Sequence, residues 1–174
     1  MENLVLQALK TRRSVRRYST RQVDEQTLQA ILEAGTYAAT GMNRQSPIMV
    51  VVQDSAALET LRQMNAEILG NPDADPFYGA PTVVVVLADA HVSTCLEDGS
   101  LVIGNLMNAA HALGVDSCWI HRAKQTFATE KGKALLRKWG ISGDYVGVGH
   151  CILGYRDGEM PETKPRKENY IYRV

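Results

Sequence analysis

The run Thr82-Val83-Val84-Val85-Val86-Leu87 is the stretch of the sequence that decides the fold. Its β-branched residues favour an extended strand, and successive side chains of a strand point to opposite faces. Both faces of this strand are therefore apolar. Because such strands are typical of the buried middle of a sheet, we expect a central strand here.

Segments on both sides of this strand alternate between helical and strand patterns. Asp24 can cap a first helix, whose apolar positions extend to Ala39 and which Gly41 ends, and Ser55 can cap a second helix. A helix from about 96 to 113 is apolar nearly all round, so we expect it in the core or at an interface. The remaining segments indicate a helix at 129–139 and strands at 48–52, 117–120 and 145–153. This order of elements indicates an α/β or α+β fold class.

The composition indicates one domain and excludes several classes of function. The 174 residues are 45% hydrophobic, which is enough for one core, so we expect a single domain over residues 1–174. The 19 basic and 19 acidic residues cancel, which argues against nucleic-acid binding. With no signal peptide and no apolar run of membrane-spanning length, we expect a cytoplasmic protein without membrane contact. The three scattered cysteines fit reduced thiols in that compartment.

Two short basic clusters lie near the ends of the chain, Arg12-Arg13-Ser14-Val15-Arg16-Arg17 and Lys164-Pro165-Arg166-Lys167. In a chain without net charge, arginines gathered around a serine indicate a local anion. Phosphate is the natural candidate, since guanidinium groups bind its oxygens bidentately. The alternative is that each cluster is a solvated surface.

The polar C-terminal stretch ends in Tyr170-Ile171-Tyr172, a pattern typical of an arm that reaches a partner subunit. A disordered tail is the alternative.

Several other motifs could carry chemistry. Gly147-Val148-Gly149 lacks the third glycine of a dinucleotide fingerprint and lies in a strand pattern. Cys118 with His121, and His150 with Cys151, lack the spacing of a zinc site, so we expect no metal. No Gly-x-Ser-x-Gly elbow indicates a hydrolase. The segment from Ala38 to Pro47, in contrast, can bring backbone groups and an amide side chain close to a flat polar ring; a helix C-cap and turn is the alternative.

Five segments together resemble the successive signatures of the nitroreductase family. In family order they are Thr11-Arg12-Arg13-Ser14-Val15-Arg16, Ala39-Thr40-Gly41-Met42-Asn43-Arg44-Gln45, Gly79-Ala80-Pro81, Asp116-Ser117-Cys118-Trp119-Ile120-His121-Arg122, and Ile152-Leu153-Gly154-Tyr155 with Lys164-Pro165-Arg166. The resemblance implies an α+β fold in which helices flank a mixed sheet. It also implies a homodimer with a long helix at the interface, an exchanged C-terminal arm, and FMN at the subunit interface.

The resemblance assigns cofactor-binding roles to thirteen residues of this chain. The family positions that bind the FMN phosphate and ribityl chain correspond to Arg12, Arg13, Ser14, Lys164 and Arg166. The family position near the pyrimidine edge of the flavin corresponds to Arg16. The position that bonds another part of the ring edge corresponds to Asn65. The loop that a partner subunit lays against the ring is matched by Thr40, Met42 and Asn43. The stretch whose backbone N–H approaches flavin N5 is matched by Ile120, His121 and Arg122.

The activity that the resemblance implies is NAD(P)H-dependent reduction of nitroaromatics, quinones or related small acceptors in a ping-pong cycle. We expect no acid–base side chain, because the cofactor carries the chemistry, and we expect Arg16 to stabilise charge on the reduced ring. Two alternatives stay open. One is a non-catalytic flavin sensor or storage protein, and the other is a family member specialised for dehydrogenation or dehalogenation.

Overall fold

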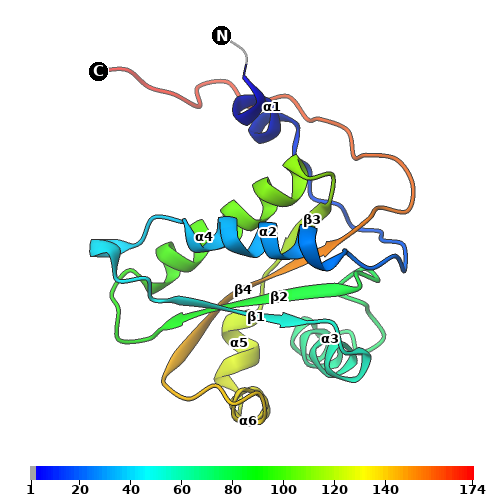
Figure 1. Ribbon diagram of the computed structural model, residues 1–174, viewed down its shortest axis with the longest axis vertical. Coiled ribbons are helices and arrows are strands. Elements are labelled where there is room, and N and C mark those ends of the chain that lie inside the picture. The colour runs from blue at the N-terminus through cyan, green and yellow to red at the C-terminus, as the bar shows by residue number, and fades with distance from the viewer. Residues whose placement is uncertain (1–2) are drawn as a thin grey trace.

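The computed structural model describes residues 3–174 and contains a four-stranded sheet between two helical layers (Figure 1). The strands are β1 (Pro47–Val52), β2 (Thr82–Asp89), β3 (Asp116–Ile120) and β4 (Tyr145–Gly154). They lie in the order β1-β2-β4-β3, and each neighbouring pair is antiparallel. Strand β2 has a neighbour on each side and is buried from Thr82 to Ala88, so its predicted central position is confirmed.

Helices cover both faces of the sheet. They are α1 (Leu4–Thr11), α2 (Glu25–Thr36), α3 (Ser55–Leu69), α4 (Cys95–Ala112), α5 (Ala123–Ala128), α6 (Glu130–Lys138) and the 3-10 turn η1 (Gly41–Asn43). Figure 1 shows α2 and α4 on one face and α3, α5 and α6 on the other. Alternate residues of β2 serve the two cores: Val83 and Val85 pack with α3 and α5, whereas Val84 and Val86 pack with α2 and α4. The α+β class is confirmed.

Parallel pairing is confined to one contact. The four strands are antiparallel throughout, and the parallel bridge within residues 3–174 joins Ser14 to Ser117. The resemblance implies a mixed sheet, with both parallel and antiparallel pairing. Within one chain, the parallel pairing therefore comes from the segment that contains the first basic cluster.

Two local predictions are wrong, and one helix was not predicted. Helix α2 ends at Thr36 and not at Gly41, because the residues after it leave the helix and form a separate turn. Asp54, not Ser55, caps α3: its carboxylate accepts the N–H of Ala57 at 2.9 Å. The helix predicted over 129–139 is confirmed as α6. The helix before it, α5, was not predicted; the extended backbone of Thr129 separates the two, and its side chain caps α6.

The glycines of β4 have a packing role. A Cβ on Gly147 would lie 2.2 Å from the carbonyl oxygen of Ala123, and a Cβ on Gly149 would lie 2.5 Å from Trp119 Nε1. Both positions need glycine because a neighbouring element approaches the strand closely. The pair therefore has a structural reason that is independent of dinucleotide binding.

After β4 the chain contains no helix or extended strand up to Val174. Residues 161–174 are exposed, and Figure 1 shows them passing α1, so α1 and the tail lie at the same end of the molecule. Exchange of this tail between subunits stays a prediction. Over residues 3–174, none of the helices combines the length and the apolar character needed to cross a membrane.

Candidate functional site

The first basic cluster forms an extended segment between α1 and the sheet. Helix α1 ends just before Arg12, whose backbone has φ −55° and ψ 136°. Ser14 then bridges Ser117 of β3, and the N–H of Val15 donates to the Ser117 carbonyl at 3.1 Å. Val15 is buried in the core. This pairing fixes the cluster beside the start of β3.

Polar atoms in and around this segment are buried without a hydrogen-bond partner. They are Arg12 Nη1, Arg13 Nε and Ser117 Oγ. The rest of the Arg13 guanidinium is occupied, since Nη1 donates to two backbone carbonyls at 2.8 and 2.7 Å and Nη2 donates to Thr163 Oγ1. Buried donors without partners are costly, and guanidinium and hydroxyl groups suit phosphate oxygens. The segment therefore fits a bound phosphate group such as that of FMN.

His111, in the last turn of α4, adjoins this cluster. Its Nε2 lies 2.8 Å from Thr11 Oγ1, and the same hydroxyl donates to the Gln7 carbonyl at 2.8 Å. A hydroxyl has one proton, so His111 Nε2 donates to Thr11. Burial lowers the pKa of His111; the nearby arginines act in the same direction and Asp116 in the opposite one. A neutral imidazole therefore ties α4 to the end of α1.

Arg16 and Arg17 are adjacent and exposed but have different partners. Arg17 Nη2 forms an ion pair with Asp157 Oδ2 at 2.7 Å. Arg16 forms no ion pair with any residue of the described chain, and its closest hydrogen bond is a long one of 3.5 Å to the Ser14 carbonyl. The Arg16 guanidinium is therefore available to a ligand, as its predicted role at the flavin ring requires.

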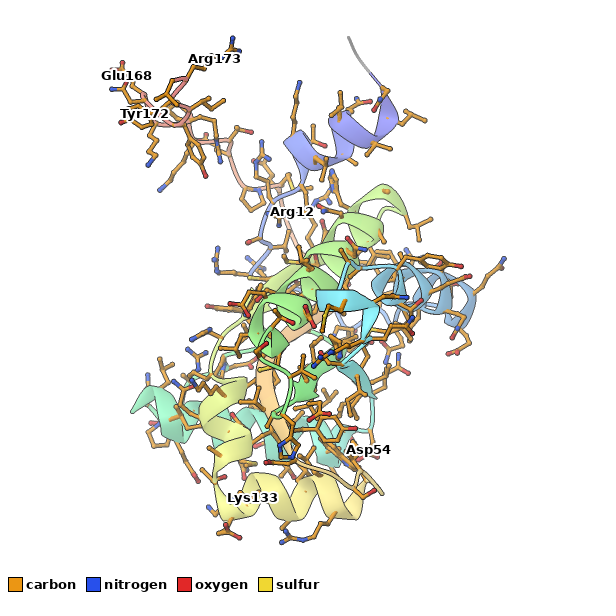
Figure 2. All side chains as sticks on the ribbon, turned by 90° about the vertical axis from the view of Figure 1, so that its left-hand side faces the viewer. Arg12, Asp54, Lys133, Glu168, Tyr172 and Arg173 are labelled. Atoms are coloured by element: carbon orange, nitrogen blue, oxygen red, sulfur yellow. The ribbon has the colours of Figure 1, made fainter. Side chains whose placement is uncertain are left out.

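Lys164 and Arg166 lie on the exposed tail, where Arg166 Nη2 donates to the Lys164 carbonyl at 2.9 Å. Among residues 3–174, neither side chain bonds to the first basic cluster; Thr163 is the tail residue that reaches Arg13. Figure 2 shows the tail continuing away from Arg12. A phosphate held by both clusters stays a prediction.

The turn around η1 contains Thr40, Met42 and Asn43. Thr40 Oγ1 accepts the N–H of Gln45 at 3.1 Å, and Asn43 Oδ1 accepts from Gln45 Nε2 at 3.3 Å. The φ angles of Met42, Asn43 and Gln45 are 53°, 54° and 51°, in a region that residues other than glycine adopt rarely. Met42 is 79% exposed. The turn thus presents an apolar and an amide side chain to solvent, a suitable surface for a flat polar ring.

This turn and the first basic cluster lie at opposite ends of α4 (Figure 1). The turn is bonded to Asp98 in the first turn of the helix, whereas α1 is bonded to His111 in the last turn. With a rise of 1.5 Å per residue, these two positions are about 20 Å apart. A ligand that touched both groups of one chain would have to span that length. Within one chain, the two groups therefore lie at opposite ends of α4.

Ile120, His121 and Arg122 lie where β3 ends and α5 begins. Ile120 is buried and His121 is exposed. Arg122 has a positive φ of 75°, and its Nε is buried without a partner. The rise of a strand, about 3.3 Å per residue, separates His121 from Ser117 by about 13 Å. Edge strand β3 therefore has the first basic cluster at one end and this predicted segment at the other.

Asn65, on α3, is completely buried. Its Nδ2 donates to the Leu61 carbonyl at 3.0 Å and to Thr126 Oγ1 at 3.4 Å, while its Oδ1 has no partner. The described structure therefore gives Asn65 no exposed atom with which to meet a flavin. Its contact with the ring edge stays a prediction.

Three further polar residues to which the sequence assigned no role adjoin the site: Ser117, His111 and Asp98. An acid inside an otherwise apolar helical pattern is a signal that could have identified Asp98, because buried charges need dedicated partners. His111 and Ser117 carry no comparable local signal. Their roles depend on contacts with residues about 100 positions away.

The chain is similar to known proteins in both sequence and fold. The model of the nitroreductase family matches residues 9–155. A solved structure described as a nitroreductase with bound FMN, from Bacteroides fragilis, is 31% identical. It superimposes with a TM-score of 0.91 over 99% of this chain and 100% of that chain.

Two archaeal proteins are also similar, and both carry the provisional name NADH dehydrogenase/NAD(P)H nitroreductase. The protein from Methanothermobacter thermautotrophicus is 29% identical over 119 residues, 66% of this chain and 59% of its own length. The protein from Archaeoglobus fulgidus is 30% identical over 161 residues, 88% of this chain and 86% of its own length. The chain thus spans under two thirds of the first relative and most of the second.

Proposed function

The chain belongs to the nitroreductase family, and from this premise we propose that it is an FMN-dependent oxidoreductase that uses NAD(P)H to reduce small acceptors. The observation that carries the proposal is the set of buried, unpartnered donors on Arg12 and Arg13 beside Ser14. They lie in the segment that the family signature assigns to the FMN phosphate. The FMN in the Bacteroides fragilis structure and the names of the archaeal relatives support the same cofactor and co-substrate.

The cofactor pocket would be built by two chains. Arg12, Arg13 and Ser14 of one chain would hold the phosphate, and Arg16 would lie at the pyrimidine edge. The turn with Met42 and Asn43 would come from the partner subunit, since it lies about 20 Å along α4 from the arginines of its own chain. The exposed tail with Lys164 and Arg166 would complete the phosphate contacts.

When bound, FMN would supply the redox chemistry by accepting hydride from NAD(P)H and passing it to an electron acceptor. The role of the protein is then binding and electrostatics. Arg16 would stabilise negative charge on the reduced ring, because a cation favours the state with more negative charge. A nitroaromatic compound or a quinone would occupy the place that the nicotinamide leaves, which is a ping-pong cycle.

The test begins with the colour of the purified protein. We expect non-covalent FMN, released by heat and identified by chromatography; release of FAD instead would contradict the cofactor assignment. NADH or NADPH added under anaerobic conditions should bleach the flavin absorbance, and a nitroaromatic or a quinone should restore it. A flavin that neither reductant bleaches would favour a sensor or storage protein. Reduction without reoxidation by either acceptor would favour a specialised reaction.

A further inference from the structure

Asp98 is a buried acidic side chain in the first turn of α4. It is 2% exposed, and no lysine, arginine or histidine of residues 3–174 forms an ion pair with it. Burial of a carboxylate without a cation is unfavourable unless hydrogen bonds satisfy its oxygens. Its partners therefore indicate what the residue does.

The partners of Asp98 come from both ends of the turn that precedes β1. Its Oδ1 accepts the N–H of Gly41 at 2.9 Å, and its Oδ2 accepts from Ser46 Oγ at 3.0 Å. Thr94 Oγ1 donates to the same Oδ2 at 3.1 Å. The positive end of the α4 dipole also favours a carboxylate in this first turn. One side chain thus joins residues 41 and 46 to the helix.

The residues between these two contacts have an unfavourable backbone. Met42, Asn43 and Gln45 all have positive φ, a conformation that persists only where the surroundings impose it. The turn is also pressed against α4, since a Cβ on Gly41 would lie 2.4 Å from Thr94 Oγ1. The hydrogen bonds to Asp98 hold the turn against α4 from outside, and the N–H of Asp89 also donates to the Ser46 carbonyl at 3.2 Å.

We propose that Asp98 is a positioning residue that fixes the Gly41–Ser46 turn, and through it Met42 and Asn43, in the conformation that contacts the flavin ring of the partner subunit. This inference rests on the proposed function, because the ring is the ligand that gives the turn its purpose. The attachment of the turn to α4 can be tested whether or not flavin is bound.

The first measurement is hydrogen–deuterium exchange of the full chain, followed in peptides that cover residues 41–46. In Asp98→Ala, exchange should be at least about tenfold faster than in the unmodified protein, because hydrogen bonds to a charged acceptor are worth that factor or more. Asp98→Asn keeps an oxygen for Gly41 and should give an intermediate rate. The matched control is Asp54→Ala, which removes a carboxylate cap from α3 and should leave these peptides unchanged. Unchanged exchange of the turn in folded Asp98→Ala would overturn the proposal.

The second measurement uses the flavin-loaded protein. Asp98→Ala should keep its flavin content, since the phosphate contacts remain, while the visible flavin bands shift and kcat/KM for the acceptor falls about tenfold or more. Asp98→Asn should recover part of both. Flavin bands and kcat/KM equal to those of Asp54→Ala would contradict the positioning role. If the unmodified protein binds no flavin, the proposed function fails, and the exchange experiment alone decides whether Asp98 fixes the turn.

Ser46→Ala covers the case in which Asp98→Ala does not fold. This variant removes one of the donors to Asp98 Oδ2 and leaves α4 and the Gly41 contact in place. We expect a smaller but measurable acceleration of exchange in residues 41–46. A rate identical to that of the unmodified protein would show that the carboxylate does not restrain the turn from both ends.

Discussion

A guanidinium nitrogen buried without a partner needs an explanation, and Arg12 Nη1 is such an atom. A bound phosphate is the explanation that the neighbouring Arg13 and Ser14 support. Arg12→Ala should therefore weaken FMN binding by about 1.5–3 kcal/mol, the range for a hydrogen bond to a charged group. Quenching of flavin fluorescence during titration of the apoprotein measures this. Lys133→Ala, at the opposite end of the molecule in Figure 2, is the control. Equal affinity of the two variants would remove Arg12 from the site.

Arg16 differs from Arg17 in having no ion pair within the described chain, and this difference gives a matched experiment. Arg16→Gln keeps a donor but removes the charge, so the reduced flavin loses more stabilisation than the oxidised flavin. We expect the two-electron potential to fall on the order of 30 mV, which corresponds to about 1.4 kcal/mol. Spectroelectrochemical titration at one pH measures the change. Arg17→Gln should leave the potential near its original value; a similar fall in both variants would mean that the effect is not specific to Arg16.

His150 gives the stability a dependence on pH. It is completely buried between the rings of Phe77 and Phe127, whose centroids lie 5.4 and 6.2 Å from its own. Burial lowers its pKa from 6.5 to about 4, and Arg122 acts in the same direction against backbone groups near residue 120. Between these two values the unfolded chain binds more protons, so the free energy of unfolding decreases as the pH falls from 6.5 towards 4. The full effect is about 3 kcal/mol.

Urea unfolding at several pH values between 4 and 7 measures this slope. His150→Leu removes the titrating group, and we expect the slope over this interval to decrease by the contribution of His150. A variant with the same pH dependence as the unmodified protein would assign the slope to other groups.

At the scale of the element, prediction from sequence works where the local pattern and the packing agree. The valines of β2 are apolar on both faces, and the structure buries both faces. The pattern of α4 likewise predicts the observed Cys95–Ala112 helix, six of whose 18 residues are buried. Helix α1 was not predicted because it is only eight residues long, and none of its residues is buried within this chain. Helix α5 was not predicted because it is only six residues long.

The candidate site likewise has parts that the sequence predicts and parts that it does not. The basic clusters and the turn with Met42 and Asn43 are contiguous motifs, so the sequence alone identifies them. The contacts that hold them are not contiguous: Ser14 with Ser117, and Gly41 with Asp98, pair residues that only the tertiary fold brings together. The fully buried state of Asn65 has the same origin, since it depends on α5 packing over α3.

The close approach of α5 to β4 gives a prediction at the element scale. In Gly147→Ala the new Cβ would lie 2.2 Å from the backbone oxygen of Ala123, which no side-chain rotation relieves. We expect destabilisation of more than about 3 kcal/mol, beyond the usual range for overpacking. Gly70→Ala is the comparison, since its φ is 77° but no atom lies within 4 Å; it should cost only about 1 kcal/mol. Denaturant unfolding measures both, and equal losses would mean that conformational freedom, not contact, explains Gly147.

At the scale of the molecule, exposed apolar residues gather on α1 and in the C-terminal tail, which lie at the same end of the molecule (Figure 1). Leu4, Val5 and Leu9 of α1 are all more than half exposed, and Ile171 in the tail is 80% exposed. Apolar surface of this extent on a small protein is typical of an interface. With the 20 Å separation of the two halves of the site along α4, it supports a dimer in which each chain completes the cofactor site of the other.

Removal of the tail after Gly154 tests this arrangement for the whole molecule. The truncated chain keeps all four strands and α1–α6, but it lacks Lys164, Arg166 and the apolar tail end. It also loses the ion pair of Arg156 with buried Asp116 inside its own chain. Because a dimer is stabilised by whatever each chain contributes to its partner, we expect loss of flavin together with aggregation or a shift towards monomer. Light scattering after size-exclusion chromatography gives the mass, and absorbance at the flavin bands gives the occupancy. The double variant Lys164→Ala, Arg166→Ala in the full chain separates the two contributions: it should lose flavin affinity but remain a dimer. A soluble truncated monomer that retains its flavin would contradict both the exchanged arm and the shared site.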